Sequence, residues 1–290
     1  MSALQQVGSS RIRHDWHQFA AGGGAAVVNI MCTFPAHKLI LRQQIDGIGG
    51  FQAFKQLRRE GFLKLFRGVG PPLLMKGVGL SVMFGSFSSF ERILTEQYPK
   101  KDPALIKVSA ALLAGTVESL LTPFERMQTL LALSEHKDFV RVHNSIHVFL
   151  KIYKHYNFKE YYRGFSAILL RNGPSTALFF SLRQPIKDSL PDTNYKFQDI
   201  LEDFISGAVL GASISTFFYP LNVVKSNMQK RLGVEYKSVY RTFLDVYDLR
   251  GRSFRKMYFG VSINFTRALA SWGIINASYE LLKEFLQEYC

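Results

Sequence analysis

The sequence repeats one pattern three times, and this repetition limits the possible folds more than any other feature. Segments rich in aromatic and basic residues, EGFLKLFRG, YNFKEYYRG and RSFRKMYFG, end at Gly68, Gly164 and Gly260. Both intervals between these glycines are 96 residues. Self-similarity at a fixed period indicates tandem structural units. We therefore expect an N-terminal tail at 1–14 and three repeats, at 15–100, 101–196 and 197–290.

Each repeat also contains a proline within a stretch that has helical patterning. Pro35, Pro123 and Pro220 lie in TFPAHKLILRQQ, LTPFERMQTLL and FYPLNVVKSNMQ. A proline inside a helix removes a backbone hydrogen bond and kinks the helix. The sequence therefore predicts three kinks at the same repeat position. Such kinks would bring the odd-numbered helices together at one end, where they could act as a gate.

Six stretches are long enough to cross a bilayer, although none is a long apolar run free of charge. They lie at 17–44, 70–93, 104–131, 166–186, 203–230 and 261–283. Charged residues inside such stretches normally face a bundle interior or a wet cavity. Polar segments between them, such as FQAFKQLRREGF, have apolar residues at spacings of three and four and predict amphipathic surface helices. Any one of these segments alone would also suit a soluble protein.

The chain has an excess of basic residues, which favours an anionic partner. It has 36 Lys and Arg against 22 Asp and Glu, which suits nucleic acid, phosphate-bearing metabolites or acidic lipid. A soluble nucleic-acid binder would carry its cations on one exposed face, whereas here they stand inside apolar stretches. Enzyme motifs such as GxSxG, HExxH and the Walker loop are absent, and Cys32 and Cys290 indicate neither a disulfide framework nor a metal cluster. We expect a transporter that is not an enzyme and binds neither metal nor nucleic acid.

The repeated residues resemble the mitochondrial carrier family, whose repeat has a Pro-x-acid-x-x-base run and a later segment that ends aromatic-base-Gly. The match extends over essentially the whole chain. It implies an all-α membrane protein with six transmembrane helices in three pseudo-symmetric repeats, short matrix-side amphipathic helices, and alternating access across the mitochondrial inner membrane. The resemblance also implies cardiolipin bound near helix N-termini, which attract anions, and no cofactor. We expect a monomer.

The gate positions depart from the family pattern. The acidic position two residues after each proline holds His37, Glu125 and Asn222, and the basic position five residues after it holds Ile40, Gln128 and Lys225. In the family the acid of one repeat pairs with the base of the next, so only Glu125 and Lys225 can form this ion pair. The aromatic-acid-x-x-base motif of the opposite gate is complete only as Tyr279, Glu280 and Lys283. We expect a loosely gated carrier.

The resemblance also places the substrate site on the even-numbered helices. It implies that the cavity is lined by Lys76, Arg171, Asn172 and Arg267. Converging cations favour a di- or polyanion, and arginine offers bidentate geometry to phosphate, so a pyrophosphate bridge fits. Glu118 breaks the repeat symmetry, and a carboxylate at membrane depth is a functional candidate. It could face the positively charged nicotinamide ring of NAD, or it could pair with a neighbouring Arg or Lys.

Several longer stretches resemble the members of the family that transport NAD. They are TPFERMQTLL, LLRNGPSTALFFSLRQPIKDSLP, FFYPLNVVKSNMQ and SWGIINASYELL. This resemblance implies that the substrate is NAD, imported into the matrix through a central cationic cavity. The alternative substrate is another nucleotide or coenzyme, such as an adenine nucleotide or a coenzyme A derivative.

Overall fold

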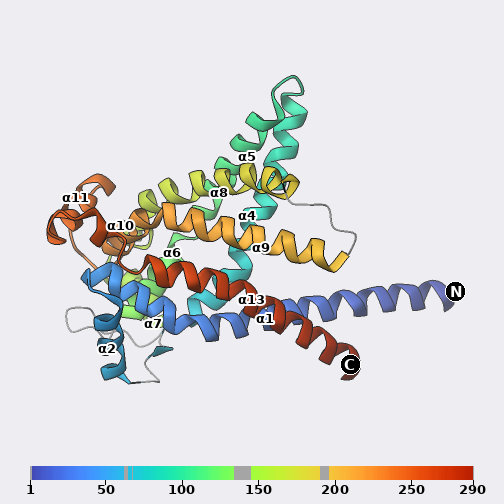
Figure 1. Cartoon of the computed structure of the whole chain (residues 1–290), viewed down its shortest axis with the longest axis horizontal. Coiled ribbons are helices and arrows are strands. Elements are labelled where there is room, and N and C mark those ends of the chain that lie inside the picture. Colours follow the sequence, from blue (N-terminus) through green and yellow to red (C-terminus); the bar gives the residue numbers. More distant parts are fainter. Residues whose placement is uncertain (1, 62–64, 67, 134–144, 190–195, 290) are drawn as a thin grey trace.

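A computed structural model describes residues 2–61, 65–66, 68–133, 145–189 and 196–289, and the elements in these ranges are helices (Figure 1). Four long helices are continuous: α1 (Ser2–Asp46), α4 (Gly70–Gln97), α8 (Phe165–Asp188) and α13 (Val261–Tyr289). Two further pairs follow one another with a short break: α5 (Pro103–Ser119) with α6 (Thr122–Leu133), and α9 (Lys196–Phe217) with α10 (Tyr219–Gln229). The short helices are α2 (Gly50–Glu60), α7 (Ser145–His155), the 3-10 helix η1 (Phe158–Tyr162), α11 (Val239–Leu249) and α12 (Phe254–Met257).

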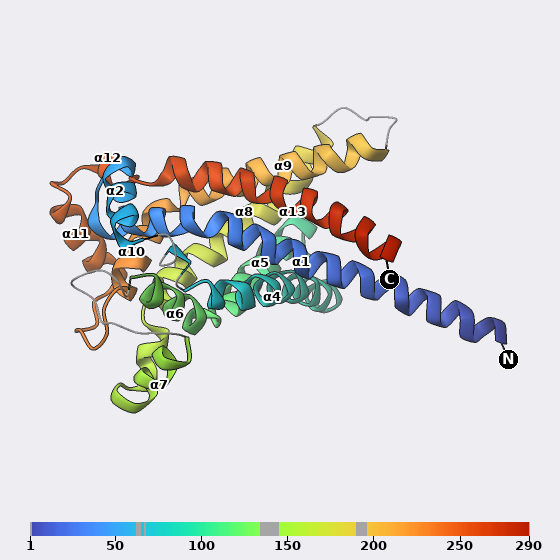
Figure 2. The same cartoon turned by 90° about the horizontal axis from the view of Figure 1, so that it is seen from below.

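The long helices form a closed bundle in the order of the chain. α1 packs against α4, α4 against α5, α5 against α8, α8 against α9, α9 against α13, and α13 returns to α1. The short helices α2, α7 and α11 gather at one end of the bundle, and both termini point toward the other end, where the long helices diverge (Figures 1 and 2). The expected all-α fold, with a short helix between the long elements of each repeat, is confirmed.

Three of the six expected spans meet criteria of length and apolar composition in the described residues. α1 meets them alone over 21–46, and the α5/α6 and α9/α10 pairs, over 103–133 and 206–229, meet them if each bent pair is one span. The other three expected spans fall on α4, α8 and α13, which have 28, 24 and 29 residues. A transmembrane helix needs about 20 residues, so all three are long enough.

The three prolines do not have the same effect on their helices. The α5/α6 pair bends by 51° and the α9/α10 pair by 61°, and Pro123 and Pro220 are the second residues of α6 and α10. A proline at a helix start costs little, because N–H groups in the first turn have no intrahelical acceptor. Pro35, by contrast, lies inside α1, which continues unbroken on both sides of it. Helix breaks therefore occur at two of the three expected positions.

Close packing between α5 and α8 fixes the position of α8, which carries Arg171. A Cβ atom at Gly115 would lie 2.7 Å from the carbonyl oxygen of Asn172 and 2.7 Å from the Cα of Gly173. Ala110, Ala111 and Ala114 on the same helix are fully buried. Small residues of this kind let two helix backbones approach closely in a membrane, so α8 is held firmly against α5.

Candidate functional site

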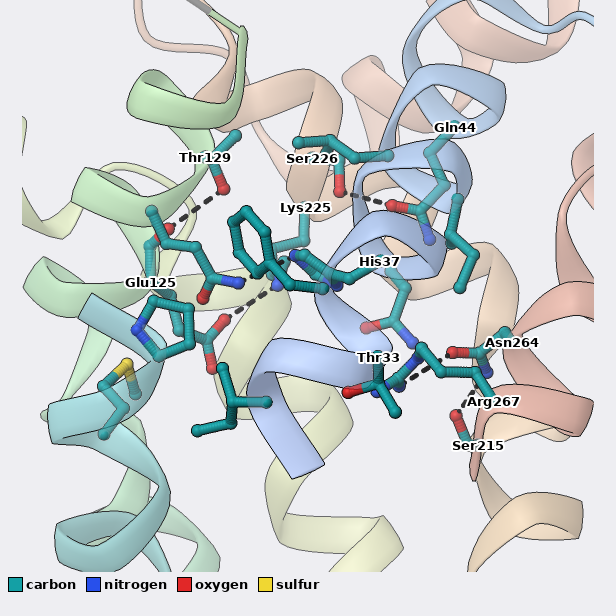
Figure 3. A pocket seen from close by; sticks show the side chains of 18 of the residues that line it. Thr33, His37, Gln44, Glu125, Thr129, Ser215, Lys225, Ser226, Asn264 and Arg267 are labelled. Atoms are coloured by element: carbon teal, nitrogen blue, oxygen red, sulfur yellow. Dashed lines mark hydrogen bonds and ion pairs between the residues drawn. The ribbon is translucent and has the colours of Figure 1, made fainter. Parts of the chain in front are cut away.

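A cavity of about 360 Å³ lies inside the bundle, lined by residues of α1, α4, α6, α8, α9, α10 and α13 (Figure 3). Its charged and ring-nitrogen side chains are those of His37, Glu125, Arg171, Lys225 and Arg267. Three cations therefore face one carboxylate among the described lining residues. This excess of two positive charges suits an anionic ligand.

Glu125 is the centre of the charged network on one side of the cavity. Its Oε2 accepts a hydrogen bond from Lys225 Nζ at 2.8 Å, and its Oε1 accepts one from Arg171 Nη2 at 3.2 Å. All three side chains are at most 20% exposed. Glu125 and Lys225, expected as a gate pair, thus lie in direct contact. Because two cations share one carboxylate, the cluster keeps a positive charge.

Three acceptors on three helices fix the guanidinium of Arg171. Besides Glu125 of α6, Arg171 Nε donates to Asn172 Oδ1 at 2.8 Å, and Nη1 donates to Asn222 Oδ1 of α10 at 2.8 Å. A planar guanidinium held in this way is oriented before any ligand arrives, which reduces the entropy cost of binding. Of its three acceptors, only Glu125 carries a charge.

At this end of the cavity, the other expected gate positions among the described side chains form no second acid–base pair between repeats. His37 Nε2 and Gln128 Nε2 lie 2.7 Å apart, so the repeat 1 and repeat 2 positions are joined by a hydrogen bond. Ile40, at the basic position of the first repeat, is buried in an apolar cluster with Tyr219 and Val223. The acid and base positions of adjacent repeats thus provide one ion pair, Glu125–Lys225, one His–Gln hydrogen bond and one apolar position at this end of the cavity.

Arg267 lies on the opposite side of the pocket from Glu125 (Figure 3). Its Nη2 donates to Asn264 Oδ1 at 3.3 Å, and Asn264 Nδ2 in turn donates to Ser215 Oγ at 2.8 Å. Its Nε is buried and has no hydrogen-bond partner among the described residues. Among the described side chains, no carboxylate forms an ion pair with Arg267, so its charge remains available to a ligand.

The other predicted site residues lie outside the cavity lining or outside the described side chains. Asn172 is buried and positions Arg171. Glu118, near the end of α5, interacts electrostatically with Arg171 and Glu125, but it forms no hydrogen bond or ion pair with a described side chain. Lys76, on α4, and Glu280 and Lys283, on α13, have side chains outside the described part of the structure.

Apart from Asn172, sequence reasoning missed the polar residues that position the cavity side chains. Asn222 appeared only as a departure from the acidic pattern, although it holds Arg171. Ser215 and Asn264 are 49 residues apart, and no local pattern links them. Gln44 accepts a hydrogen bond from Ser226 Oγ at 2.8 Å, which joins the first repeat to the third. Such long-range contacts leave no periodic signal in the sequence.

A second charged cluster, around Glu160, ties repeat 2 to repeat 3 at the end of the bundle with the short helices. Glu160 Oε1 accepts from Arg126 Nη2 at 2.6 Å, and Glu160 also binds Arg163 through two nitrogens, at 2.9 to 3.1 Å. All three side chains are at least 96% buried. The Tyr236 hydroxyl donates to Glu160 at 3.0 Å, and burial, then this hydrogen bond, raises the pKa of Tyr236. Arg126 also donates to the carbonyl of Arg231.

Comparisons with protein families and with individual proteins both find similarity over nearly the whole chain. The family model "Mitochondrial carrier protein" matches residues 13–98, 100–194 and 197–289. The chain is 42% identical to the human "Mitochondrial nicotinamide adenine dinucleotide transporter SLC25A51", with 91% of this chain and 88% of the relative covered. Its mouse counterpart is 41% identical, with 92% and 89% covered. The human "Mitochondrial nicotinamide adenine dinucleotide transporter SLC25A52" is 41% identical with the same coverage, 92% and 89%.

Proposed function

This chain belongs to the mitochondrial carrier family, and on that basis we propose that it imports NAD into the matrix. In this proposal it is a multi-pass protein of the mitochondrial inner membrane. NAD binds in the central cavity and crosses by alternating access between the two ends of the bundle. The relatives that share about two fifths of its residues are NAD transporters by name, which supports this substrate.

The observation that carries the proposal is the charge of the cavity. Arg171 and Lys225 share the carboxylate of Glu125, and Arg267 forms no ion pair with a described side chain. The excess of two positive charges matches the two negative charges of a pyrophosphate bridge. Arginine suits this role, because its planar fork can donate two parallel hydrogen bonds to a phosphate group. In this proposal Arg171 and Arg267 bind the pyrophosphate from opposite sides.

Glu118 supplies the selectivity for the oxidised nicotinamide ring in this proposal. It is a partly buried carboxylate close enough to Arg171 to interact electrostatically, and it forms no ion pair with a described side chain. A carboxylate in such surroundings attracts a ligand cation strongly, because the local dielectric constant is low. The ring of NAD carries a positive charge that NADH lacks. Lys76 is assigned to the cavity as a further cation, and Asn172 positions Arg171.

The remaining parts of the proposal concern the class of protein and its lipid. The chain is a carrier rather than an enzyme, it requires no cofactor, and it works as a monomer. Cardiolipin binds near helix N-termini, where free backbone N–H groups and the helix dipole favour phosphate.

Uptake of labelled NAD into liposomes that contain the purified protein tests the substrate. Unlabelled NAD, NADH, ATP and coenzyme A serve as competitors, and we expect NAD to compete best. Glu118→Gln should reduce the preference for NAD over NADH by about tenfold, because one charge interaction is lost. Glu96→Gln is the matched control, since Glu96 is exposed near the end of α4. If ATP or coenzyme A competes better than NAD, the carrier assignment stands and the NAD substrate is wrong.

A further inference from the structure

We propose that Asn222 is a positioning residue that keeps Arg171 oriented for the substrate and adds no negative charge to the cluster around Glu125. Its side chain is an amide at the position where the family pattern has an acid. The amide oxygen supplies the hydrogen-bond acceptor that Arg171 needs without supplying a negative charge. This inference rests on the proposed function and deepens it, because it explains how the same site selects ligands by charge.

The geometry around Arg171 supports a positioning role for Asn222. Asn222 belongs to α10, whereas Arg171 belongs to α8, and the bond between Oδ1 and Nη1 is 2.8 Å long. Nε and Nη2 are fixed by Asn172 and Glu125 at 2.8 and 3.2 Å. Each of the three guanidinium nitrogens therefore has one acceptor. Two of the five N–H groups have no acceptor among the described residues and can donate to a ligand.

The charges in the cavity explain why the acceptor should be neutral. Glu125 already offsets one of the two cations that it contacts, Arg171 and Lys225. An acid at 222 would offset the other, and the cluster around Glu125 would become neutral. Arg267 would then be the single uncompensated cation among the described lining residues. The neutral amide therefore preserves half of the positive charge that the cavity offers to a pyrophosphate group.

Asn222→Asp changes this charge with almost no change in shape. The new carboxylate would still accept from Arg171 Nη1, so the guanidinium stays in place. It would also stand three residues before Lys225 on α10, where an acid and a base can pair on one helix face. The substitution should therefore lower affinity for anionic substrates by about tenfold. The loss should increase along the series NAD, NADH and ATP, because the negative charge of the ligand increases in that order.

Asn222→Ala separates positioning from charge. It removes the acceptor of Arg171 Nη1 and adds no charge, so the arginine loses orientation but keeps its attraction for anions. We expect reduced maximal uptake with a loss of affinity that does not depend on ligand charge. Asn157→Asp is the control for added charge, because Asn157 is exposed beside the short helices and does not line the central cavity.

Two readouts on purified wild type and the three variants test the inference. One is the ligand-dependent rise in unfolding temperature in detergent, which reports binding, and the other is uptake into liposomes. We expect Asn222→Asp to lose much of the wild-type affinity for ATP and a smaller part of the affinity for NAD. Asn157→Asp should bind both nucleotides as wild type does. The inference would be overturned if Asn222→Asp bound every nucleotide with the affinity of wild type. Equal losses of affinity for NAD and for ATP would also overturn it.

The same experiment distinguishes this inference from the proposed function. If wild type takes up NAD and Asn222→Asp matches it, the inference is wrong and the proposed function stands. If wild type binds and transports another nucleotide but not NAD, the substrate is wrong, and the charge-dependent loss in Asn222→Asp then tests the inference on that nucleotide. If wild type binds no nucleotide, both are wrong.

Discussion

Glu160→Gln should strongly destabilise the protein, because Glu160 is the counter-ion of two buried arginines. Arg126 and Arg163 are 0% and 4% exposed and both form ion pairs with this carboxylate. In the described part of the chain, two other nitrogens of Arg126, Nε and Nη1, are buried without a hydrogen-bond partner, so the guanidinium depends on Glu160. Glutamine keeps the size of the side chain but leaves both positive charges uncompensated in the interior.

The expected magnitude follows from the burial of the pair. Removing one partner of a buried ion pair costs about 3 to 5 kcal/mol. For a domain of roughly this size, 1 kcal/mol shifts the unfolding midpoint by about 2 to 4 °C. Glu160→Gln should therefore lower the midpoint by roughly 6 to 20 °C. The loss should also release the segment around Tyr236, whose hydroxyl donates to Glu160.

Scanning fluorimetry of the purified protein in detergent measures this midpoint. Asp248→Asn is the matched control, because it makes the same chemical change in the exposed ion pair between Asp248 and Arg252. Exposed pairs contribute little to stability, so this variant should unfold at the wild-type temperature. Equal midpoints for Glu160→Gln and Asp248→Asn would refute the argument that the Glu160 cluster holds repeats 2 and 3 together.

Two further substitutions test helix packing and the role of Arg267, a cavity cation that forms no ion pair with a described side chain. Gly115→Ala should lower stability by about 1 to 3 kcal/mol, because its Cβ would overlap the backbone of α8. Gly85→Ala should be at least as stable as wild type, because nothing lies within 4 Å of the added Cβ. Thermal unfolding of both variants checks this. If both variants unfold alike, the close approach of α5 and α8 is wrong. Arg267→Gln should unfold at or above the wild-type temperature in the same assay, because Arg267 Nε is buried and has no partner in the part of the chain that the structure describes. A clearly lower midpoint would show that this arginine serves stability rather than ligand binding.

The fold followed from features that repeat along the chain. The constant spacing of Gly68, Gly164 and Gly260 predicted three units, and the prolines predicted where helices bend. Pro123 and Pro220 stand at helix breaks, but α1 continues through Pro35. The sequence did not distinguish these cases, because a proline inside a helix and one at a helix start look alike locally.

The site was partly predictable, and the limit lies at contacts between distant residues. The resemblance to the family, in which the acid of one repeat pairs with the base of the next, identified Glu125 and Lys225, and the structure places their side chains 2.8 Å apart. That Arg171 joins the same carboxylate, 46 residues away in the chain, depends on how α8 sits against α6. Glu160 was missed because it lies four residues before Gly164, whereas Glu60 lies eight before Gly68. The acid of the second repeat is out of register, so the repeat pattern did not identify it.

The most direct test of the central claim compares the concentration dependence of NAD uptake by wild type and Arg267→Gln in liposomes. The account predicts saturable uptake by wild type and a KM at least about tenfold higher in Arg267→Gln, because a charge contact with the pyrophosphate is lost. The thermal unfolding assay would show that the variant remains folded. No saturable NAD uptake by folded wild type, or the same KM in both proteins, would contradict the claim that NAD crosses through this cationic cavity.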